Sequence, residues 1–464
     1  MGRFGKLIKN SAIFAISNMS SSLISFLLVR FYTELLSAEQ YGTIDLITTT
    51  ASMLIPFFTI AIVEAVLRFS IDSVNREHIF TAGIVISIAG SIVYLVIGSP
   101  VLIRLGYGEY SYWIAALIFL QSTGSVVSQF VRGVGRISVF AIYGVIKTAV
   151  LVLCNIVLLL GLGWRIEGYL LSILISEIIS AVFLVIKAKL WKYISLQFDL
   201  ITIKSMVKYS LPLVPSSLSL WLLSATDKFM LVKMIGMNAN GLYAVAHKIP
   251  TLISTVNEFF LRAWQLSAVE EANSQSKDRF YTDIFNAMAS FLFIGASIIL
   301  MMLKSITQIL VSENYTEVWR YSPYLVLAMI ASSFANFLGT NYTVTKRTKG
   351  ALTTSIIGAG INIALNFVFI RLMGIIGAGL ATMISYTVTA LIRGIDTRRD
   401  VKIQYAYASM FISVLVLLVQ ATAISFSWKY ERIFHAVSIL CICILNRKVL
   451  VLIKSAFMHK RACK

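Results

Sequence analysis

The 464-residue chain has few residues of the kinds that build metal sites, disulfide frameworks or a soluble surface. Only 13% of its residues are charged, and it has four cysteines and four histidines. The cysteines form no CxxC pair and the histidines have no metal-ligand spacing. No GxxxxGK[ST] string is present, which argues against ATP hydrolysis at a P-loop. We therefore expect no metal and no cofactor, and cysteines that serve as apolar filler. The cysteines are Cys154, Cys441, Cys443 and Cys463.

Long apolar stretches fill the chain instead, and 58% of its residues are hydrophobic. A hydrocarbon core about 30 Å thick needs about 20 apolar helical residues. The chain contains about fourteen stretches of this length. They lie near 11–31, 42–63, 79–100, 112–132, 139–161, 168–187, 209–232, 241–262, 284–305, 321–343, 352–371, 378–395, 406–427 and 433–453. The sequence therefore predicts an all-α polytopic membrane protein.

The loops between these predicted spans are alternately rich and poor in basic residues. Of 40 Lys and Arg, 28 lie at the two termini and in the even-numbered loops, nine lie in the odd-numbered loops and three lie inside spans. Positive charge accumulates on the cytoplasmic side, so both termini are predicted to be cytoplasmic. The same rule predicts that the segment from Glu313 to Arg320 is outside. It places these loop residues in the cytoplasm: Lys346, Arg347, Lys349, Arg398 and Arg399. Because the basic residues lie between spans, we expect membrane lipids and no nucleic acid as partners.

The chain has no loop long enough to form a soluble catalytic domain. Its longest polar stretches, about 188–208 and 265–283, are cytoplasmic on this plan. An enzyme that acts on sugars at the membrane needs a long extramembrane loop for its acid–base carboxylates. We therefore expect a protein that is not an enzyme.

The sequence contains an internal repeat. Gly42 and Gly241 hold the same place just before the second and eighth spans, and the strings at 166–172 and 375–381 open the sixth and twelfth. Two six-span halves with one orientation are related by a pseudo-twofold axis along the membrane normal, and they place a substrate path between them. The predicted architecture is an N-terminal lobe at 1–200, a C-terminal lobe at 201–400, and two further helices and a tail at 401–464.

A set of four residues in and just after the second predicted span recurs in the eighth. Pro56, Glu64, Leu67 and Arg68 recur with identical spacing at Pro250, Glu258, Leu261 and Arg262. This register differs by five residues from the one that Gly42 and Gly241 set, so chance is an alternative explanation. In either case the prolines are expected to kink their helices, and Glu and Arg four residues apart can pair.

Charged side chains inside a span cost about 2.5–3.5 kcal/mol at its centre and normally face a bundle interior or a water-filled cavity. Lys147 and Lys248 lie deep in their spans without an acid three or four residues away, so we expect both to line a cavity. Asp227 and Lys228 are adjacent and point to different sides of a helix. At most one of these two aims directly into a narrow cavity.

For other charged residues and for two asparagines, a structural role is an alternative to lining a cavity. Snorkelling to the headgroups is open for Arg30, Arg68 and Arg262, and a neutral ion pair is open for Glu258 with Arg262. For Asn362 and Asn366, one turn apart, we prefer interhelical hydrogen bonding to a polar cavity wall. The acids and one base that we consider for coupling or gating are Glu64, Arg68, Glu177, Asp227 and Glu258.

Several strings resemble bacterial polysaccharide transporters. Residues 362–370 and 374–386 resemble the eleventh and twelfth spans of that family, 227–231 and 241–249 its seventh and eighth, and 36–42 its first loop. The family is the polysaccharide transport branch of the multidrug/oligosaccharidyl-lipid/polysaccharide flippase superfamily. The strings do not separate this branch from lipid II flippases or multidrug exporters. A structural role in a polysaccharide assembly complex is a third hypothesis.

The resemblance implies a fourteen-helix transporter of two lobes in the bacterial inner membrane. It also implies flipping of undecaprenyl-pyrophosphate-linked oligosaccharides for O-antigen, capsule or exopolysaccharide, with a polysaccharide polymerase and assembly proteins as partners. Bare burial of a pyrophosphate is prohibitive, and a hydrated cavity lined with basic residues lowers that cost. The residues expected to bind the substrate there are Lys147, Lys248, Lys228 and Arg262.

Overall fold

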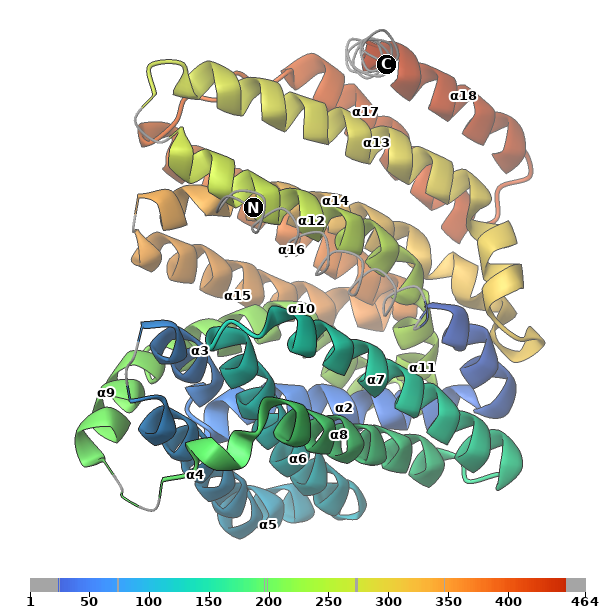
Figure 1. Cartoon of the computed structure of the whole chain (residues 1–464). Helices are drawn as coiled ribbons and strands as arrows, with labels where there is room; N and C mark the ends of the chain where they lie inside the picture. The colour runs from blue at the N-terminus through green and yellow to red at the C-terminus, as the bar shows by residue number, and fades with distance from the viewer. Residues whose placement is uncertain are drawn as a thin grey trace, which may run out of the picture. The chain divides into compact units, whose positions relative to one another are not determined.

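A computed structural model describes residues 24–447 except 25, 73–74, 196, 198, 272–273 and 346. Most of the expected first span at 11–31 lies outside the described residues, as do Lys346 and Cys463. The chain forms two compact units, Met1–Ala225 and Thr226–Lys464. Each unit is a bundle of helices, and the described residues contain no strand (Figure 1).

The first unit has a broken helix followed by four long helices. Residues 26–35 are helical and lead into this unit. Its further elements are α2 (Ala38–Phe58), α3 (Ile62–Asp72), α4 (Arg76–Val93), η1 (Tyr94–Gly98), α5 (Ser99–Leu102), η2 (Ile103–Tyr107), α6 (Gly108–Gly133), α7 (Ile137–Asn155), η3 (Ile156–Gly161), α8 (Ile166–Ala188), η4 (Leu190–Tyr193) and α9 (Leu200–Ser210). Helix α10 (Leu213–Met234) contains the division between the units.

The second unit is also built of helices. Its elements are α11 (Met237–Ala246), α12 (Lys248–Glu270), α13 (Lys277–Leu310), η5 (Glu313–Arg320), α14 (Ser322–Val344), α15 (Thr348–Met373), α16 (Ile375–Asp396), η6 (Thr397–Arg399), α17 (Tyr407–Ser425) and α18 (Glu431–Leu445). Helices α13, α17 and α18 pack side by side, and α14 packs against α12, α13, α16 and α17 (Figure 1).

The second expected span begins at a capping box and breaks after its proline. Ser37 accepts a hydrogen bond from the Gln40 amide, and the Gln40 side chain accepts one from the Ser37 amide. Pro56 lies inside α2, which ends two residues later. Ile60 and Ala61 have φ of 56° and 48°, and α3 leaves at 60° to α2. The expected kink is confirmed here, and it is a break between two helices.

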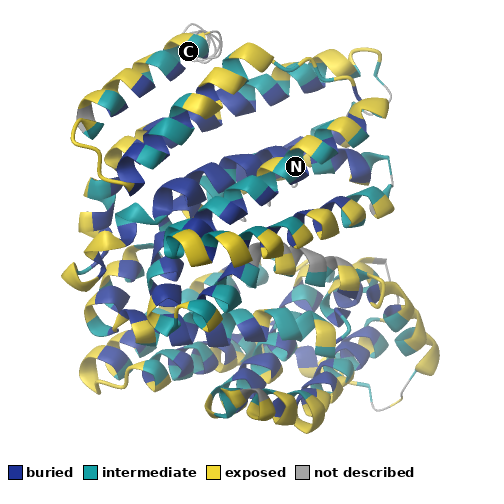
Figure 2. Ribbon diagram, turned by 180° about the vertical axis from the view of Figure 1, so that it is seen from behind, coloured by how far each residue is buried: buried dark blue, intermediate teal, exposed yellow. Residues whose placement is uncertain are grey.

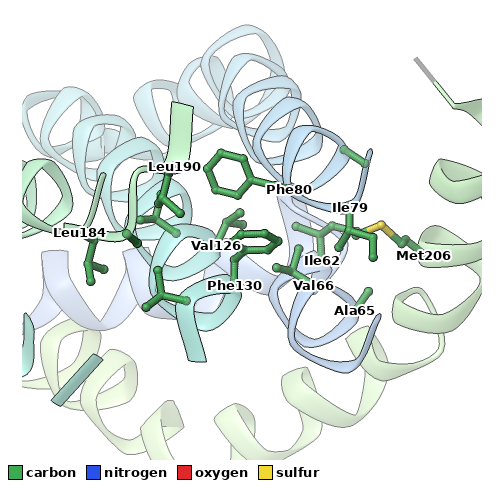
Figure 3. Close-up of a cluster of buried hydrophobic side chains, with 14 of the residues drawn as sticks. Ile62, Ala65, Val66, Ile79, Phe80, Val126, Phe130, Leu184, Leu190 and Met206 are labelled. Carbon is green, nitrogen blue, oxygen red and sulfur yellow. The ribbon is translucent and has the colours of Figure 1, made fainter. Parts of the chain in front are cut away.

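A cluster of buried apolar side chains holds the first unit together (Figure 3). Val66 of α3, Phe80 of α4, Phe130 of α6 and Leu184 of α8 meet in it, and Met206 of α9 packs against them. Helix α9 therefore belongs to the first compact unit, which extends beyond residue 200. The lobe boundaries at 1–200, 201–400 and 401–464 stay predictions of the repeat.

The amino-terminal end of α9 carries its own cap. The Asp199 carboxylate accepts hydrogen bonds from Thr202 Oγ1 at 2.5 Å and from the Ile201 amide at 3.0 Å. The Thr202 bond holds the pKa of this exposed carboxyl below its usual range.

Aromatic packing and buried polar pairs hold the second unit together. Trp264 of α12 stacks on Phe337 of α14, with ring centroids 4.3 Å apart. Gln420 of α17 exchanges two hydrogen bonds with Ser297 of α13, at 2.9 and 3.1 Å. Side-chain pairs of this kind are common between membrane helices, where apolar surface gives little driving force for association.

Nine helices of the described chain are long and apolar enough to cross a membrane, or ten with the bent pair of α2 and α3. Each overlaps a predicted span. Large apolar side chains such as Leu153, Leu372 and Phe411 are exposed. Figure 2 shows exposed and buried positions on opposite sides of many helices. Such exposure suits lipid and not water. The chain is therefore a multi-pass membrane protein, and the count of fourteen spans remains a prediction.

The repeated glycines lie at the same distance from the start of their helices in both halves of the chain. Helix α2 begins four residues before Gly42, and α11 begins four residues before Gly241. Helices α8 and α16 begin two residues before Gly168 and Gly377. A Cβ at Gly377 would lie 2.0 Å from the Phe369 carbonyl oxygen, so only glycine lets α16 pack this closely on α15.

Candidate functional site

Lys147 and Glu177 form an ion pair inside the first unit. Lys147 projects from α7 and Glu177 from α8, and the Lys147 Nζ donates to Glu177 Oε1. The Glu177 side chain is 3% exposed and that of Lys147 36%. Lys147 has no acid three or four residues away on its own helix, but the neighbouring helix supplies one. Substrate binding by Lys147 stays a prediction.

Glu64 and Arg68 lie on one face of α3, just after the break that follows α2. Both are exposed, whereas Ala65 and Val66 between them are buried in the core of the unit. Because of the bend, the helix that carries these two charges runs in a different direction from α2. Their proposed roles in coupling or gating stay predictions.

A chain of buried polar side chains surrounds Asp227 in the second unit. Asp227 Oδ2 accepts hydrogen bonds from the Tyr243 hydroxyl and, at 3.3 Å, from Thr382 Oγ1. The Asn362 amide donates to Thr382 Oγ1 at 3.4 Å, and the Asn366 amide donates to Asn362 Oδ1 at 2.9 Å. The helices α10, α11, α15 and α16 each contribute to this chain. The preference for interhelical hydrogen bonding by Asn362 is confirmed.

The Asp227 cluster surrounds a buried carboxylate with hydroxyl and carboxamide groups. Asp227 is 2% exposed, and Asn366 Oδ1 is buried without a hydrogen-bond partner in the described chain. A carboxylate, hydroxyls and carboxamides are ligands for a proton or a hard cation. Lys228, the next residue, is half-buried, and the expected division of the two charges between helix faces stays a prediction.

Lys248 lies at a helix break and not deep in a continuous span. The expected span at 241–262 divides at His247, so Lys248 is the first residue of α12 and Pro250 lies in its first turn. Lys248 is half-buried, and none of the ion pairs between described residues includes it. Lys248 thus stands at the start of α12, and its expected depth in the membrane and its place in a cavity stay predictions.

Glu258 and Arg262 share one face of α12, as their spacing predicts. Arg262 Nη2 lies 3.8 Å from Glu258 Oε2, and both side chains are about two thirds exposed. They border a cavity of about 510 Å³ among α12, α14, α15 and α16. Arg393 of α16 also lines this cavity.

Sequence reasoning missed Arg393. Its position near the end of a span groups it with the basic residues of the following loop, but it is buried, with 7% exposure. Its guanidinium is enclosed by α14, α15 and α16. No signal in the sequence identifies these partners, because Ala335, Thr354 and Ser355 are ordinary residues of apolar helices.

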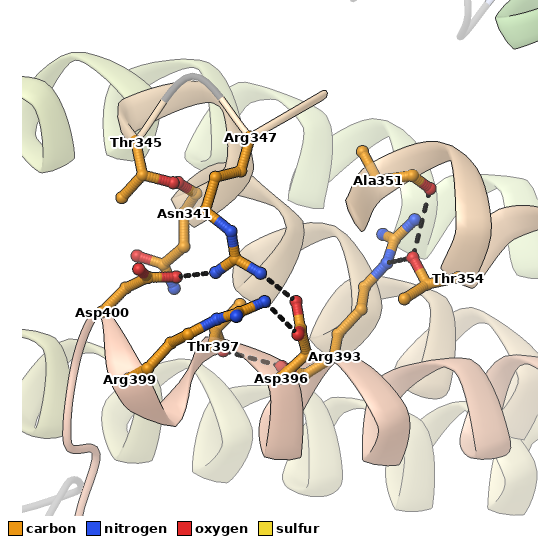
Figure 4. A network of polar contacts seen from close by, with 10 residues as sticks. All are labelled: Asn341, Thr345, Arg347, Ala351, Thr354, Arg393, Asp396, Thr397, Arg399 and Asp400. Carbon is orange, nitrogen blue, oxygen red and sulfur yellow. Dashed lines mark hydrogen bonds and ion pairs between the residues drawn. The ribbon is translucent and has the colours of Figure 1, made fainter. Parts of the chain in front are cut away.

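A network of ion pairs joins the loop before α15 to the end of α16 (Figure 4). Arg347 pairs with Asp396 at 2.8 Å and with Asp400 at 2.5 Å, and Arg399 pairs with Asp396 at 2.6 Å. A second cavity, of about 630 Å³, lies beside this network and is also lined by Lys349. The two loops therefore lie at one end of the second unit.

Comparison with solved structures places the fold. The lipid II flippase MurJ in its inward closed conformation is 13% identical, has a TM-score of 0.69, and covers 97% of this chain and 100% of its own. A multidrug resistance MATE family transporter of the MOP superfamily, inward-facing, is 12% identical, with a TM-score of 0.68 and coverage of 83% and 97%. An outward-facing one is 13% identical, with a TM-score of 0.60 and coverage of 84% and 94%.

Comparison of sequences identifies the family. No curated protein sequence matches the chain. The family profile described as "Polysaccharide biosynthesis protein" matches residues 7–264, more than half of the chain, and confirms the resemblance drawn from the strings. The chain belongs to the polysaccharide biosynthesis protein family and has the fold of the multidrug/oligosaccharidyl-lipid/polysaccharide flippase superfamily.

Proposed function

We propose that this protein flips undecaprenyl-pyrophosphate-linked oligosaccharide repeat units across the bacterial inner membrane by alternating access of its two repeats. The family match over residues 7–264 carries the proposal. The polyprenyl tail stays in lipid, while the pyrophosphate and sugars need a hydrated, basic path. The product is a precursor for O-antigen, capsule or exopolysaccharide, and a polymerase and assembly proteins receive it.

Basic side chains in both units support an anionic substrate. Lys147 lies in the first unit, and Lys228, Lys248 and Arg262 lie in the second. The carboxylate of Asp227 is the coupling candidate that the structure supports best, because it is buried and accepts hydrogen bonds from hydroxyls of two other helices, α11 and α16. Protonation or cation binding there would change the charge that the four helices enclose.

Export of lipid II is the second candidate function. The lipid II flippase structure covers 97% of this chain, whereas the two multidrug transporters cover 83% and 84%. The lipid II flippase structure therefore aligns with a larger share of this chain. A multidrug exporter is the weaker alternative for the same reason.

A reconstituted flipping assay tests the proposal. Full-length protein in proteoliposomes receives either an undecaprenyl-pyrophosphate-linked oligosaccharide or lipid II, and the accessible fraction of each is followed with time. We expect the parent protein to translocate the lipid-linked oligosaccharide. We expect the Asp227→Asn variant to translocate it more slowly and at a rate that does not respond to a proton or cation gradient. Translocation of lipid II alone would overturn the proposal in favour of the second candidate.

A further inference from the structure

Arg393 is a buried cation held by neutral groups. Its Nε donates to Thr354 Oγ1 at 3.0 Å and its Nη2 to Ser355 Oγ at 3.0 Å, both on α15. Its Nη1 donates to the Ala335 carbonyl oxygen on α14 at 2.8 Å. Figure 4 shows the side chain extending from α16 toward Thr354. The guanidinium is therefore positioned by two helices besides its own.

The nearest acid along α16 is committed elsewhere. Asp396, three residues after Arg393, pairs with Arg347 and Arg399 through its two carboxylate oxygens. Figure 4 shows these pairs on the side of Asp396 away from Arg393. No ion pair within the described ranges includes Arg393. A buried charge without a counter-charge is costly, so its retention points to an anionic ligand.

Part of the donor capacity of Arg393 remains available. A guanidinium carries five N–H groups, and the described neighbours accept from three nitrogens once each. One N–H on each terminal nitrogen is left, and this pair matches the fork that binds phosphate oxygens. Gly339 of α14 makes room for the group, since a Cβ there would lie 2.8 Å from Arg393 Nη1.

The cavity that Arg393 lines is polar and carries net positive charge. Its charged side chains are Arg393, Arg262 and Glu258, which gives two cations and one anion. Glu258 lies 3.8 Å from Arg262, so it leaves Arg393 uncompensated. Arg262 and Gln265 are exposed, and they form an accessible rim on α12. The remaining lining residues are Leu261, Asn336, Gly339, Thr340, Thr343 and Ala351.

We propose that this cavity, the Arg393 cavity, binds a phosphate group carried by a membrane lipid, with Arg393 as its principal donor and Asn336 and Thr343 as neutral donors. The volume of about 510 Å³ accommodates a pyrophosphate. The lipid is the pyrophosphate-linked substrate or an anionic phospholipid. The first of these sources rests on the proposed function, whereas the phosphate specificity of the cavity does not.

Binding of inorganic pyrophosphate to the full-length protein in zwitterionic nanodiscs tests the site by calorimetry. Arg393→Gln removes the charge, and we expect it to weaken binding about tenfold or more. Gly339→Ala retains the charge but displaces the guanidinium, so it is expected to weaken binding as well. Arg398→Gln is the matched control, because it removes a basic residue that bonds to Tyr407 at the same end of α16 and lies outside the cavity. Its affinity should equal that of the parent.

Two further titrations distinguish the lipid sources. Undecaprenyl pyrophosphate that competes with inorganic pyrophosphate identifies the substrate lipid, and phosphatidylglycerol that competes alone identifies a phospholipid. Absence of pyrophosphate binding by the parent protein overturns the inference. So does an Arg393→Gln protein with a lower melting midpoint but parental affinity, since Arg393 is then only a bridge between helices. If the protein binds pyrophosphate through Arg393 but does not flip the lipid-linked oligosaccharide, the proposed function is contradicted and the phosphate site is not.

Discussion

Lys147 and Glu177 stand 30 positions apart in the sequence, yet they pair across α7 and α8. Removing the lysine leaves a carboxylate that is 3% exposed without its partner. Because Lys147 is about a third exposed, we expect Lys147→Ala to cost on the order of 1–3 kcal/mol, below the about 3–5 of a fully buried pair. A melting curve in detergent measures this loss, and Lys147→Ala with Glu177→Gln should recover it.

Flipping separates substrate binding from a structural role of this pair. If Lys147 also binds the pyrophosphate, Lys147→Ala abolishes flipping, Lys147→Arg retains part of it, and the double variant recovers stability without recovering flipping. Recovery of flipping by the double variant would show that the pair is structural. Lys304→Ala is the control, since Lys304 pairs with Glu431 and packs on Trp319, 4.2 Å from its ring centroid. It should lower stability and leave flipping unchanged.

Residue-scale sequence reasoning identified charged positions better than their partners. Glu258 and Arg262 were predictable because a helix brings residues four apart to one face. The partner of Lys147 was not, because interhelical contacts depend on packing that hydropathy does not specify. Arg393 was missed for a similar reason: the neutral oxygens that hold its guanidinium come from α14 and α15, far from it in sequence.

At the scale of elements, the close packing of α15 and α16 depends on Gly377. Gly377→Ala places a Cβ 2.0 Å from a backbone oxygen, and backbone cannot move aside as a side chain can. We expect a loss of roughly 1–3 kcal/mol, seen as a lower melting midpoint. Gly168→Ala, at the corresponding start of α8, should cost less, because its nearest contacts are side-chain carbons at 3.0 and 3.3 Å.

The control for this comparison is Gly360→Ala on α15, where a Cβ meets nothing within 4 Å. That substitution should keep or slightly raise the melting midpoint, because alanine favours helix over glycine. Equal effects of all three substitutions would contradict close packing as the reason for the glycine at 377.

Hydropathy located most of the helices but not their breaks. Nine predicted spans have a long apolar helix in the structure, because about 20 apolar residues in a row leave few alternatives to a spanning helix. The break at Ile60 and Ala61 follows a proline, so a bend was predictable there. The break at His247 comes three residues before Pro250, and the sequence placed Lys248 inside a continuous span.

At the scale of the whole molecule, charge bias and structure bear on topology in different ways. The ion pairs of Arg347 with Asp396 and Asp400 place the loops on either side of α15 and α16 at one end of the second unit. Helix α14, 23 residues long, separates Arg347 from the segment Glu313–Arg320. The structure thus places these two regions at opposite ends of one helix, while the charge bias predicts which end is cytoplasmic.

Single cysteines at Glu313 and Lys349, in a background lacking the native cysteines, test that assignment. Both positions are exposed at helix ends. An impermeant thiol reagent applied to intact spheroplasts should label the cysteine at 313, and it should label the one at 349 only after permeabilisation. Placing Arg347, Lys349, Arg398 and Arg399 outside would bring four basic residues to the side where few are tolerated. Labelling of the cysteine at 349 from outside would therefore invert the topology, and with it the direction of transport proposed for this protein.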